Sequence, residues 1–94
     1  MYYVYILMNK SNERFYVGHA YDLKKRVWEH KNHVDPEAHT AKYNITKLVY
    51  FECGDDFYES RAREKQIKKY SRKKKYALVE KDNPYFSELY YDLF

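Results

Sequence analysis

The chain has 94 residues, of which 45% are hydrophobic and 34% charged, and its formal net charge is +4 at pH 7. This length leaves room for one small core and excludes separate substrate and cofactor domains. The composition is typical of a folded globular protein rather than a disordered chain, and its most unusual count is 13 tyrosines.

A single cysteine, Cys53, excludes an intrachain disulfide. Small extracellular domains usually need such cross-links, so we expect a cytoplasmic protein. The apolar run at residues 2–8 is far shorter than the ~20 residues that cross a bilayer. No basic segment precedes this run and no small-residue cleavage site follows it, so we expect no signal peptide, no membrane anchor and no membrane partner.

The first predicted elements are the two strands of an antiparallel hairpin. Residues 2–8 and 14–18 are rich in strand-forming residues, and residues 9–13 between them have the composition of a turn. A loop of this length suits an antiparallel pair. We expect Gly18 to end the second strand, because glycine is depleted within strands.

A helix is predicted next, with Asp22 as its N-cap and its end near residue 33. Leu23 and Val27 are four residues apart and would face the core. Arg26 and His30 have the same spacing and would share an adjacent polar face. The predicted helix therefore carries an apolar stripe beside two side chains that are suited to chemistry.

The second half predicts one strand and three helical segments. Residues 34–46 are expected to form a loop, and residues 47–52 a strand that is broken by the glycine two positions later. Helices are predicted over 57–70 and 71–81, and Asn83-Pro84 is a favourable start for a last short helix. The order β-β-α-β-α-α predicts an α+β fold in which a small sheet is flanked by helices.

The positive charge is concentrated in residues 61–75, which hold nine lysines or arginines and one acid, a net charge of +8. The rest of the chain therefore has a net charge of −4. Such a block predicts a polyanionic partner, with nucleic acid first and an anionic membrane surface second. A solvated helix face explains the charge equally well.

Several function classes are excluded by the absence of their motifs. The chain has neither the glycine-rich loops that cradle phosphates nor a GxSxG nucleophile motif, and it contains two glycines in all. Its four histidines are not spaced as the ligands of a zinc site. They are His19, His30, His33 and His39.

Glu64 is the one acid of the basic block, and its helical spacing places it on the same stripe as Ser60 and Ile67. One interpretation is an ion pair within the helix, worth a few tenths of a kcal/mol on an exposed face. The other is a ligand for a hard cation, because one carboxylate can bind Mg²⁺ when phosphate oxygens and water complete the octahedron. On spacing alone, the ion pair is the favoured interpretation.

Taken in order, the motifs resemble those of the GIY-YIG nuclease superfamily, and in pattern its small stand-alone members. The matching segments are Tyr3-Val4-Tyr5, Tyr16-Val17-Gly18, Asp22 to Arg26 with His30, and Arg63-Glu64-Lys65. The resemblance implies one α+β domain over residues 1–94, with a three-stranded antiparallel sheet and a helical extension at 71–94. It also implies cleavage of DNA phosphodiesters with one divalent ion, Mg²⁺ or Mn²⁺.

Matched position by position, the resemblance implies a role for each candidate residue. Tyr16 would activate water, Tyr5 would be a hydrogen-bonding partner within the site, and Arg26 would contact the phosphate. Glu64 would hold the metal ion, and His30 would act from the same helix face as Arg26.

Three further positions follow from the same match. Gly18 and Asn83 would support the site, and His19 would assist the base, since an imidazole that titrates near neutrality can relay a proton. A surface histidine is the alternative for His19. Tyr3 stands where the family motif has glycine, a departure that bears on backbone geometry.

We therefore predict a metal-dependent DNA endonuclease of the repair, recombination or processing type, with RNA as a second candidate substrate and a separate targeting protein as a candidate partner. Nucleic acid would be bound by the basic residues Lys68, Lys69, Arg72, Lys73, Lys74 and Lys75. The main alternative is a nucleic-acid-binding module that has lost turnover. A protein or membrane partner of the basic helix ranks last, because it does not explain Tyr16, Arg26 and Glu64.

Overall fold

A three-stranded antiparallel sheet in the order β2-β1-β3 lies at the centre of the computed structural model, which describes residues 1–94. The strands are β1 (Tyr2–Met8), β2 (Phe15–Ala20) and β3 (Lys47–Gly54). β1 is the central strand, so β2 and β3 are the two edges. The sheet and its helices confirm the predicted α+β fold.

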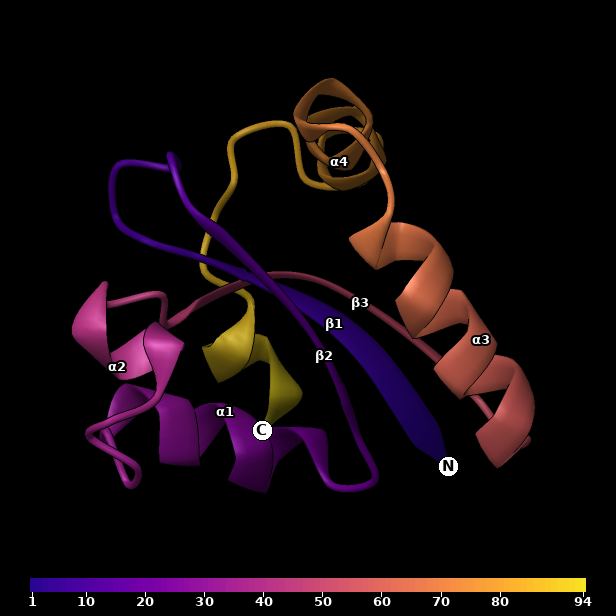
Figure 1. Cartoon of the computed structure of the whole chain (residues 1–94), viewed down its shortest axis with the longest axis horizontal. Helices are drawn as coiled ribbons and strands as arrows, with labels where there is room; N and C mark the ends of the chain where they lie inside the picture. The colour runs from indigo at the N-terminus through magenta and orange to yellow at the C-terminus, as the bar shows by residue number, and fades with distance from the viewer.

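Helices cover both faces of this sheet (Figure 1). They are α1 (Leu23–Lys31), α2 (His39–Lys42), α3 (Phe57–Lys68), α4 (Arg72–Glu80) and the short 3₁₀ turn η1 (Tyr90–Leu93). In Figure 1, α3 and α4 lie on one side of the strands, and α1, α2 and the C-terminal turn lie on the other. No helix of the chain has the length and apolar character that a membrane span requires.

The alternation of side chains along β1 produces two separate cores. Val4, Ile6 and Met8 point to one face, where they pack with Ile67 of α3 and Val79 of α4. The other face has its own cluster, made of Tyr5, Leu7, Leu23, Val27, Ile45, Leu48 and Tyr90. Each fully buried aliphatic side chain contributes roughly 1.5–3 kcal/mol, so both helical layers are held to the sheet mainly by apolar burial.

Side-chain N-caps are present at three helices, and Asp22 is the one predicted above. The side chains of Asp22, Asp56 and Ser71 each accept a hydrogen bond from the backbone N–H three residues later, at 3.1, 2.9 and 3.1 Å respectively. Caps of this kind are worth about 1 kcal/mol each. They set the starts of α1, α3 and α4.

Two strand ends differ from the prediction. β2 continues past Gly18 to Ala20, because Gly18 pairs with Tyr5 in the ladder and has no positive φ angle. β3 likewise runs to Gly54, which pairs with Tyr2. Neither glycine breaks its strand, since both keep the extended backbone of their neighbours.

The helix ends also differ. α1 stops at Lys31 rather than near residue 33, because His33 has a left-handed φ of 49° and the Asn32 amide caps the Trp28 carbonyl at 2.8 Å. α3 stops at Lys68, two residues early, because Ser71 is extended in order to cap α4.

The segment predicted as a loop contains the single turn α2, whose Thr40 is buried.

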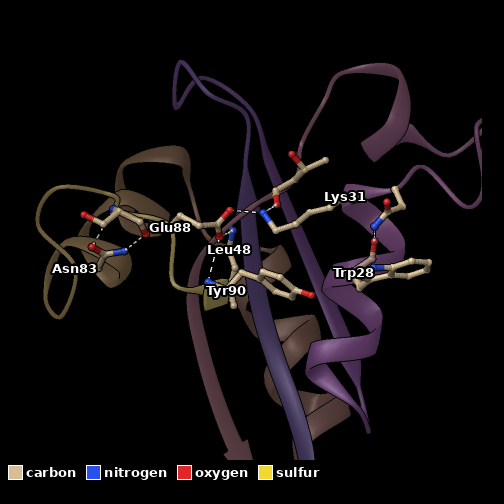
Figure 2. Close-up of polar contacts among 9 residues, drawn as sticks. Trp28, Lys31, Leu48, Asn83, Glu88 and Tyr90 are labelled. Atoms are coloured by element: carbon tan, nitrogen blue, oxygen red, sulfur yellow. Dashed lines mark hydrogen bonds and ion pairs between the residues drawn. The ribbon is translucent and has the colours of Figure 1, made fainter. Parts of the chain in front are cut away.

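The predicted helix at Asn83-Pro84 is absent, because the Asn83 side chain is used to fold the following loop back on itself. Its Nδ2 donates to the carbonyls of Val49 at 3.0 Å and Ser87 at 2.9 Å, and its Oδ1 accepts from the Ser87 N–H at 3.0 Å. Figure 2 shows Asn83 at this loop. Asn83 therefore anchors the C-terminal segment to β3, the edge of the sheet farthest from β2.

Glu88 makes the second anchor of the C-terminal segment (Figure 2). Its carboxylate accepts from the backbone N–H groups of Leu48 at 2.7 Å and Tyr90 at 3.2 Å, and it forms an ion pair with Lys31 of α1. One carboxylate thus joins α1, β3 and η1 on a single face of the sheet.

Candidate active site at the β2 edge of the sheet

Two tyrosines of the hairpin lie on the α1 face of the sheet. Tyr5 is directly opposite Gly18 in the register of β1 and β2, and directly opposite residues in an antiparallel pair share one face. Tyr16 lies two positions before Gly18 and therefore shares that face as well. Tyr5 is fully buried, whereas Tyr16 is half-buried at the edge strand. Their ring centroids are 6.2 Å apart.

Gly18 makes this arrangement possible through its missing side chain. A Cβ at this position would lie 2.4 Å from Cζ and 2.5 Å from the hydroxyl oxygen of Tyr5, and 2.8 Å from Cε2 of Tyr16. These distances are shorter than any normal contact, so the Tyr5 ring crosses β2 only because residue 18 is glycine. The sequence predicted Gly18 as a supporting residue, and the structure places it directly against both tyrosines.

His30 of α1 joins the buried tyrosine to the segment at α2. Its Nε2 lies 3.0 Å from the Tyr5 hydroxyl and its Nδ1 lies 3.1 Å from the Thr40 hydroxyl. Burial, with the nearby charge of Arg26, lowers the pKa of His30 to about 4, so the imidazole is neutral at pH 7. Either tautomer satisfies both hydrogen bonds, because each hydroxyl can donate or accept.

The Tyr5 hydroxyl keeps its proton. Burial, reinforced by the neighbouring Tyr16, raises the pKa of Tyr5 well above its usual value, and the positive charge of Arg26 offsets this in part. Tyr5 is therefore suited to hold or pass a proton rather than to act as a base. Arg26 itself is firmly charged, since the Tyr5 hydroxyl beside it raises its pKa.

An open hollow of about 290 Å³ lies in front of this cluster, and we call it the Tyr16 hollow. Tyr16, Arg26 and His30 line it together with residues of the 33–41 segment. The Arg26 side chain is 50% exposed and lies 3.6 Å from Glu29, so its guanidinium remains available to an anion. The structure thus brings four of the predicted residues to one place, with Tyr5 beneath the other three.

The opposite face of β2 carries His19. Its Nε2 lies 2.7 Å from the Ser60 hydroxyl, and that hydroxyl donates to the Phe57 carbonyl at 2.8 Å. Because the single Ser60 proton is used in this way, Nε2 of His19 is the donor, and Nδ1 carries the lone pair in the neutral ring. Burial lowers the pKa of His19, which favours that neutral form.

Glu64 of α3 is buried on the same face as His19, with 5% of its surface exposed. Its carboxylate forms ion pairs with Arg61 at 3.1 Å and Lys68 at 2.9 Å, one to each oxygen. The sequence placed Glu64 on the apolar stripe of its helix, and its burial beside Ile67 agrees with that placement.

The donor set at Glu64 fits a hard divalent cation that takes most of its ligands from elsewhere. No group of three or more His, Cys, Asp or Glu side chains lies together anywhere in the chain, so a fully protein-made metal cage is absent. Mg²⁺ is commonly held by one or two carboxylates, with water and substrate phosphate as the other ligands. A cation at Glu64 would replace Arg61 or Lys68 at one carboxylate oxygen.

The two faces meet around the β2 edge. His19 and Arg26 line one hollow of about 350 Å³ at the turn between β2 and α1, although they start on opposite faces. The negative charge of Glu64 also contributes to the raised pKa of Tyr5 and acts on His19. Glu64 itself lines neither this hollow nor the Tyr16 hollow, so its link to the tyrosines is a long-range effect of its charge.

The predicted nucleic-acid-binding residues do not form one uniform surface. Lys68 is paired with Glu64, and the Lys74 ammonium lies 4.1 Å from the ring centroid of Tyr70. Arg72 lies over Phe15 and Tyr76, and Lys75 also lies over Phe15. The exposed residues Lys69 and Lys73 extend this charge along the ends of α3 and α4.

Sequence reasoning missed the two hydroxyls that orient the histidines. Thr40 lies in a segment predicted as a loop, and its pairing with His30 spans ten residues that show no repeating pattern. Ser60 shares the helical stripe of Glu64, which was the one available signal for its burial. Asn83 makes its contacts at β3 rather than with Tyr16, Arg26 or Glu64.

The model of the GIY-YIG catalytic domain family matches residues 1–77. The UPF0213 protein of Haloquadratum walsbyi is 40% identical over 78 residues, which cover 83% of this chain and 85% of that protein. The UPF0213 protein of Clostridium perfringens is 39% identical over 79 residues, which cover 84% and 83% respectively.

A solved structure has a similar fold. The solution NMR structure of the UPF0213 protein from Bacillus halodurans aligns with a TM-score of 0.58 at 27% sequence identity. The alignment covers 94% of this chain and 93% of that one. The similarity therefore includes the C-terminal segment beyond residue 77.

Proposed function

The chain belongs to the GIY-YIG catalytic domain family, a family of nucleases, and on that premise we propose that it is a DNA endonuclease that depends on one Mg²⁺ or Mn²⁺ ion. The observation that carries the proposal is the convergence of Tyr16, Arg26 and His30 on one open hollow above the buried Tyr5. Such a set combines a phosphate-binding cation with a chain of proton carriers, as phosphodiester hydrolysis requires.

Tyr16 is the proposed acceptor of the proton from the attacking water. It is the more exposed of the two tyrosines, and its ring centroid lies 5.2 Å from that of His30. A phenol has an ordinary pKa near ~10, so it serves as a base only where cations stabilise the phenolate. Arg26 in the same hollow supplies one positive charge.

Tyr5, His30 and Thr40 form a hydrogen-bonded chain beneath Tyr16. A change of the His30 tautomer moves one proton between the Tyr5 side and the Thr40 side of the ring. The proposed role of this chain is to hold Tyr16 in place and to keep a proton available nearby. His19 offers a second acceptor at Nδ1, on the other face of the edge strand.

Arg26 is the proposed contact for the scissile phosphate, because a half-exposed guanidinium offers a planar fork of donors to phosphate oxygens. Glu64 would hold the divalent ion. When bound, the ion supplies Lewis acidity to a phosphate oxygen and stabilises the departing oxygen. The protein side chains position the DNA strand and transfer the protons.

The proposal is tested by nicking of supercoiled and branched DNA, and of RNA in a parallel arm, with Mg²⁺, Mn²⁺ or EDTA. We expect DNA nicking that needs the metal and that falls about 10²- to 10³-fold in Glu64→Gln. Tyr85→Phe is a control at a site that is 87% exposed, and it should leave the nicking unchanged. Undiminished nicking in Glu64→Gln would contradict the proposal.

A binding module without turnover is the second candidate, and one observation favours it. Both oxygens of Glu64 are already neutralised by Arg61 and Lys68, which is the arrangement of a structural ion pair. This candidate predicts DNA binding that is the same in EDTA and in Mg²⁺, with no nicking under either condition. Metal-dependent nicking that is lost in Glu64→Gln excludes it.

A further inference from the structure

A second hollow, of about 440 Å³, lies beside the Tyr16 hollow along the exposed edge of β2. It is lined by Glu13, Arg14, Phe15, His39 and Arg72. His39 also lines the Tyr16 hollow, so the two hollows adjoin at this residue. We call the surface formed by Arg14, His39, Tyr43 and Arg72 the edge path.

The edge path is preorganised by contacts between segments far apart in the sequence. The Arg72 guanidinium donates to the backbone carbonyl of Glu13 and to the Tyr76 hydroxyl, and that hydroxyl donates to the Asn12 carbonyl. These bonds fix the start of α4 against the hairpin loop. They hold Arg72 next to the edge strand β2 before any ligand binds.

The aromatic part of the edge path is Tyr43, which follows α2. Its ring lies 4.8 Å from the His39 ring, and the Arg14 guanidinium lies 3.9 Å from the Tyr43 centroid. Arg14 covers part of the ring, yet 43% of the residue remains exposed. An exposed ring beside arginines is the arrangement that binds single-stranded nucleic acids, where bases stack and phosphates meet cations.

The local charge favours nucleic-acid binding at this end of β2 rather than at the other end. A second group of exposed aromatics, Tyr21, Phe57 and Tyr58, lies at the opposite end of β2. The start of α3 at that end carries the acids Asp55, Asp56 and Glu59, which repel phosphate. The second hollow, which the edge path lines, has one acid, Glu13, beside Arg14 and Arg72, and Arg72 begins the basic helix α4.

We propose that the edge path binds the single strand that leads away from the Tyr16 hollow, with its phosphates on Arg14 and Arg72 and an unpaired base on Tyr43. The inference rests on the proposed function, because it takes the strand to be the one held for cleavage. The substrate class is then nucleic acid that is unpaired on the edge-path side of the scissile bond.

Binding of a short labelled single strand and of the matched duplex, measured by fluorescence anisotropy in EDTA, tests the charge component. Arg14→Gln should weaken single-strand binding about fivefold and lower the salt slope by about 0.7. Glu13→Gln should strengthen it by a similar factor, because it removes the one acid of the same hollow. Lys24→Gln is the control, because it removes an equal charge outside the edge path, on α1, where the Lys24 ammonium lies over the ring of Phe94. It should change the affinity by less than about twofold.

The base-stacking component is tested at Tyr43. Tyr43→Ala should weaken single-strand binding roughly tenfold and leave duplex binding unchanged, and Tyr43→Phe should bind like the parent chain. Thermal unfolding of each variant shows that it is folded before its affinity is compared.

Equal losses in Arg14→Gln and Lys24→Gln, or weaker binding in Glu13→Gln, would overturn the edge path. Equal loss on duplex and single strand in Tyr43→Ala would overturn the unpaired occupant.

The outcome separates this inference from the nuclease proposal. A parent chain that nicks DNA, while Arg14→Gln and Lys24→Gln bind alike, refutes the edge path and leaves the nuclease intact. A parent chain that never nicks, yet shows the predicted variant pattern in EDTA, refutes the nuclease and leaves the edge path intact.

Discussion

The two faces of the sheet at the β2 edge hold polar groups in different ways. On the α1 face, Tyr5, His30 and Thr40 form a chain of neutral groups, each bonded to the next. On the α3 face, the buried Glu64 is charged against two cations, Arg61 and Lys68. Buried neutral hydroxyls need only hydrogen bonds, whereas a buried charge needs countercharges. The α1 face therefore holds hydrogen-bonded neutral groups that can exchange protons, whereas the α3 face holds a buried carboxylate with its countercharges.

This difference also separates what substitutions should do on each face. Changes on the α1 face disturb close packing around Gly18 and Tyr5. Changes on the α3 face disturb an ion cluster whose cations are about half exposed and can return to water. Unfolding measurements on single variants of each face test this contrast.

The largest effect on stability is expected at Gly18. Gly18→Ala places a methyl group 2.4 Å from the buried Tyr5 ring, so the ring or the strand must move. We expect a loss of about 3 kcal/mol in the free energy of unfolding, measured by urea denaturation. Gly54→Ala is the matched control, because nothing lies within 4 Å of a Cβ there. Equal losses at the two glycines would contradict the crossing of Tyr5 over β2.

The next effect is a pH dependence that comes from His30. Its pKa is about 4 in the folded chain against the ordinary 6.5, so the unfolded chain binds the proton at higher pH. The resulting stability is fully present above about pH 6.5 and is lost as the pH falls toward 4. We expect this loss to be about 1–2 kcal/mol, because His30 is partly exposed and solvent screens it.

The control for this pH dependence is His30→Gln, which removes the titrating group. Urea denaturation at several pH values should show a flatter profile between pH 6.5 and 4 for this variant than for the parent chain. Profiles that coincide would mean that another group causes the acid sensitivity.

Effects equal to or smaller than that of His30 are expected at the two hydroxyls that orient the histidines. Thr40→Val removes the partner of His30 Nδ1 at a residue that is 3% exposed, and we expect a loss of about 1–2 kcal/mol. Ser60→Ala should cost about 0.5–1 kcal/mol, because the half-buried His19 can bond to water instead. Denaturation curves that rank the two in the opposite order would contradict the contrast between a buried proton chain and a more open face.

Much of the fold could be predicted from local sequence. The run of strand formers at 2–8 gave the correct bounds of β1, and Asp22 and Ser71 mark the starts of their helices as predicted. These signals are local, since a cap acts within one turn and strand propensity acts within a few residues.

The errors arose where a side chain is used by a distant part of the chain. Gly18 was interpreted as a strand end, yet its role depends on Tyr5, thirteen residues earlier on the paired strand. Asn83 was interpreted as a helix start, yet its amide bonds to Val49 of β3. The turn α2 is too short to give a periodic signal, and its position follows from the burial of Thr40 against His30.

The central claim is that both faces act on one phosphodiester bond, and a double-variant cycle of nicking rates tests it most directly. Tyr16→Phe, Glu64→Gln and the double variant are compared with the parent chain under single-turnover conditions in Mg²⁺. Residues that act as a unit are strongly non-additive, so we expect the double variant to be about as slow as the slower single variant. Losses that multiply, giving a double variant slowed by the product of the two single effects, would contradict a single site.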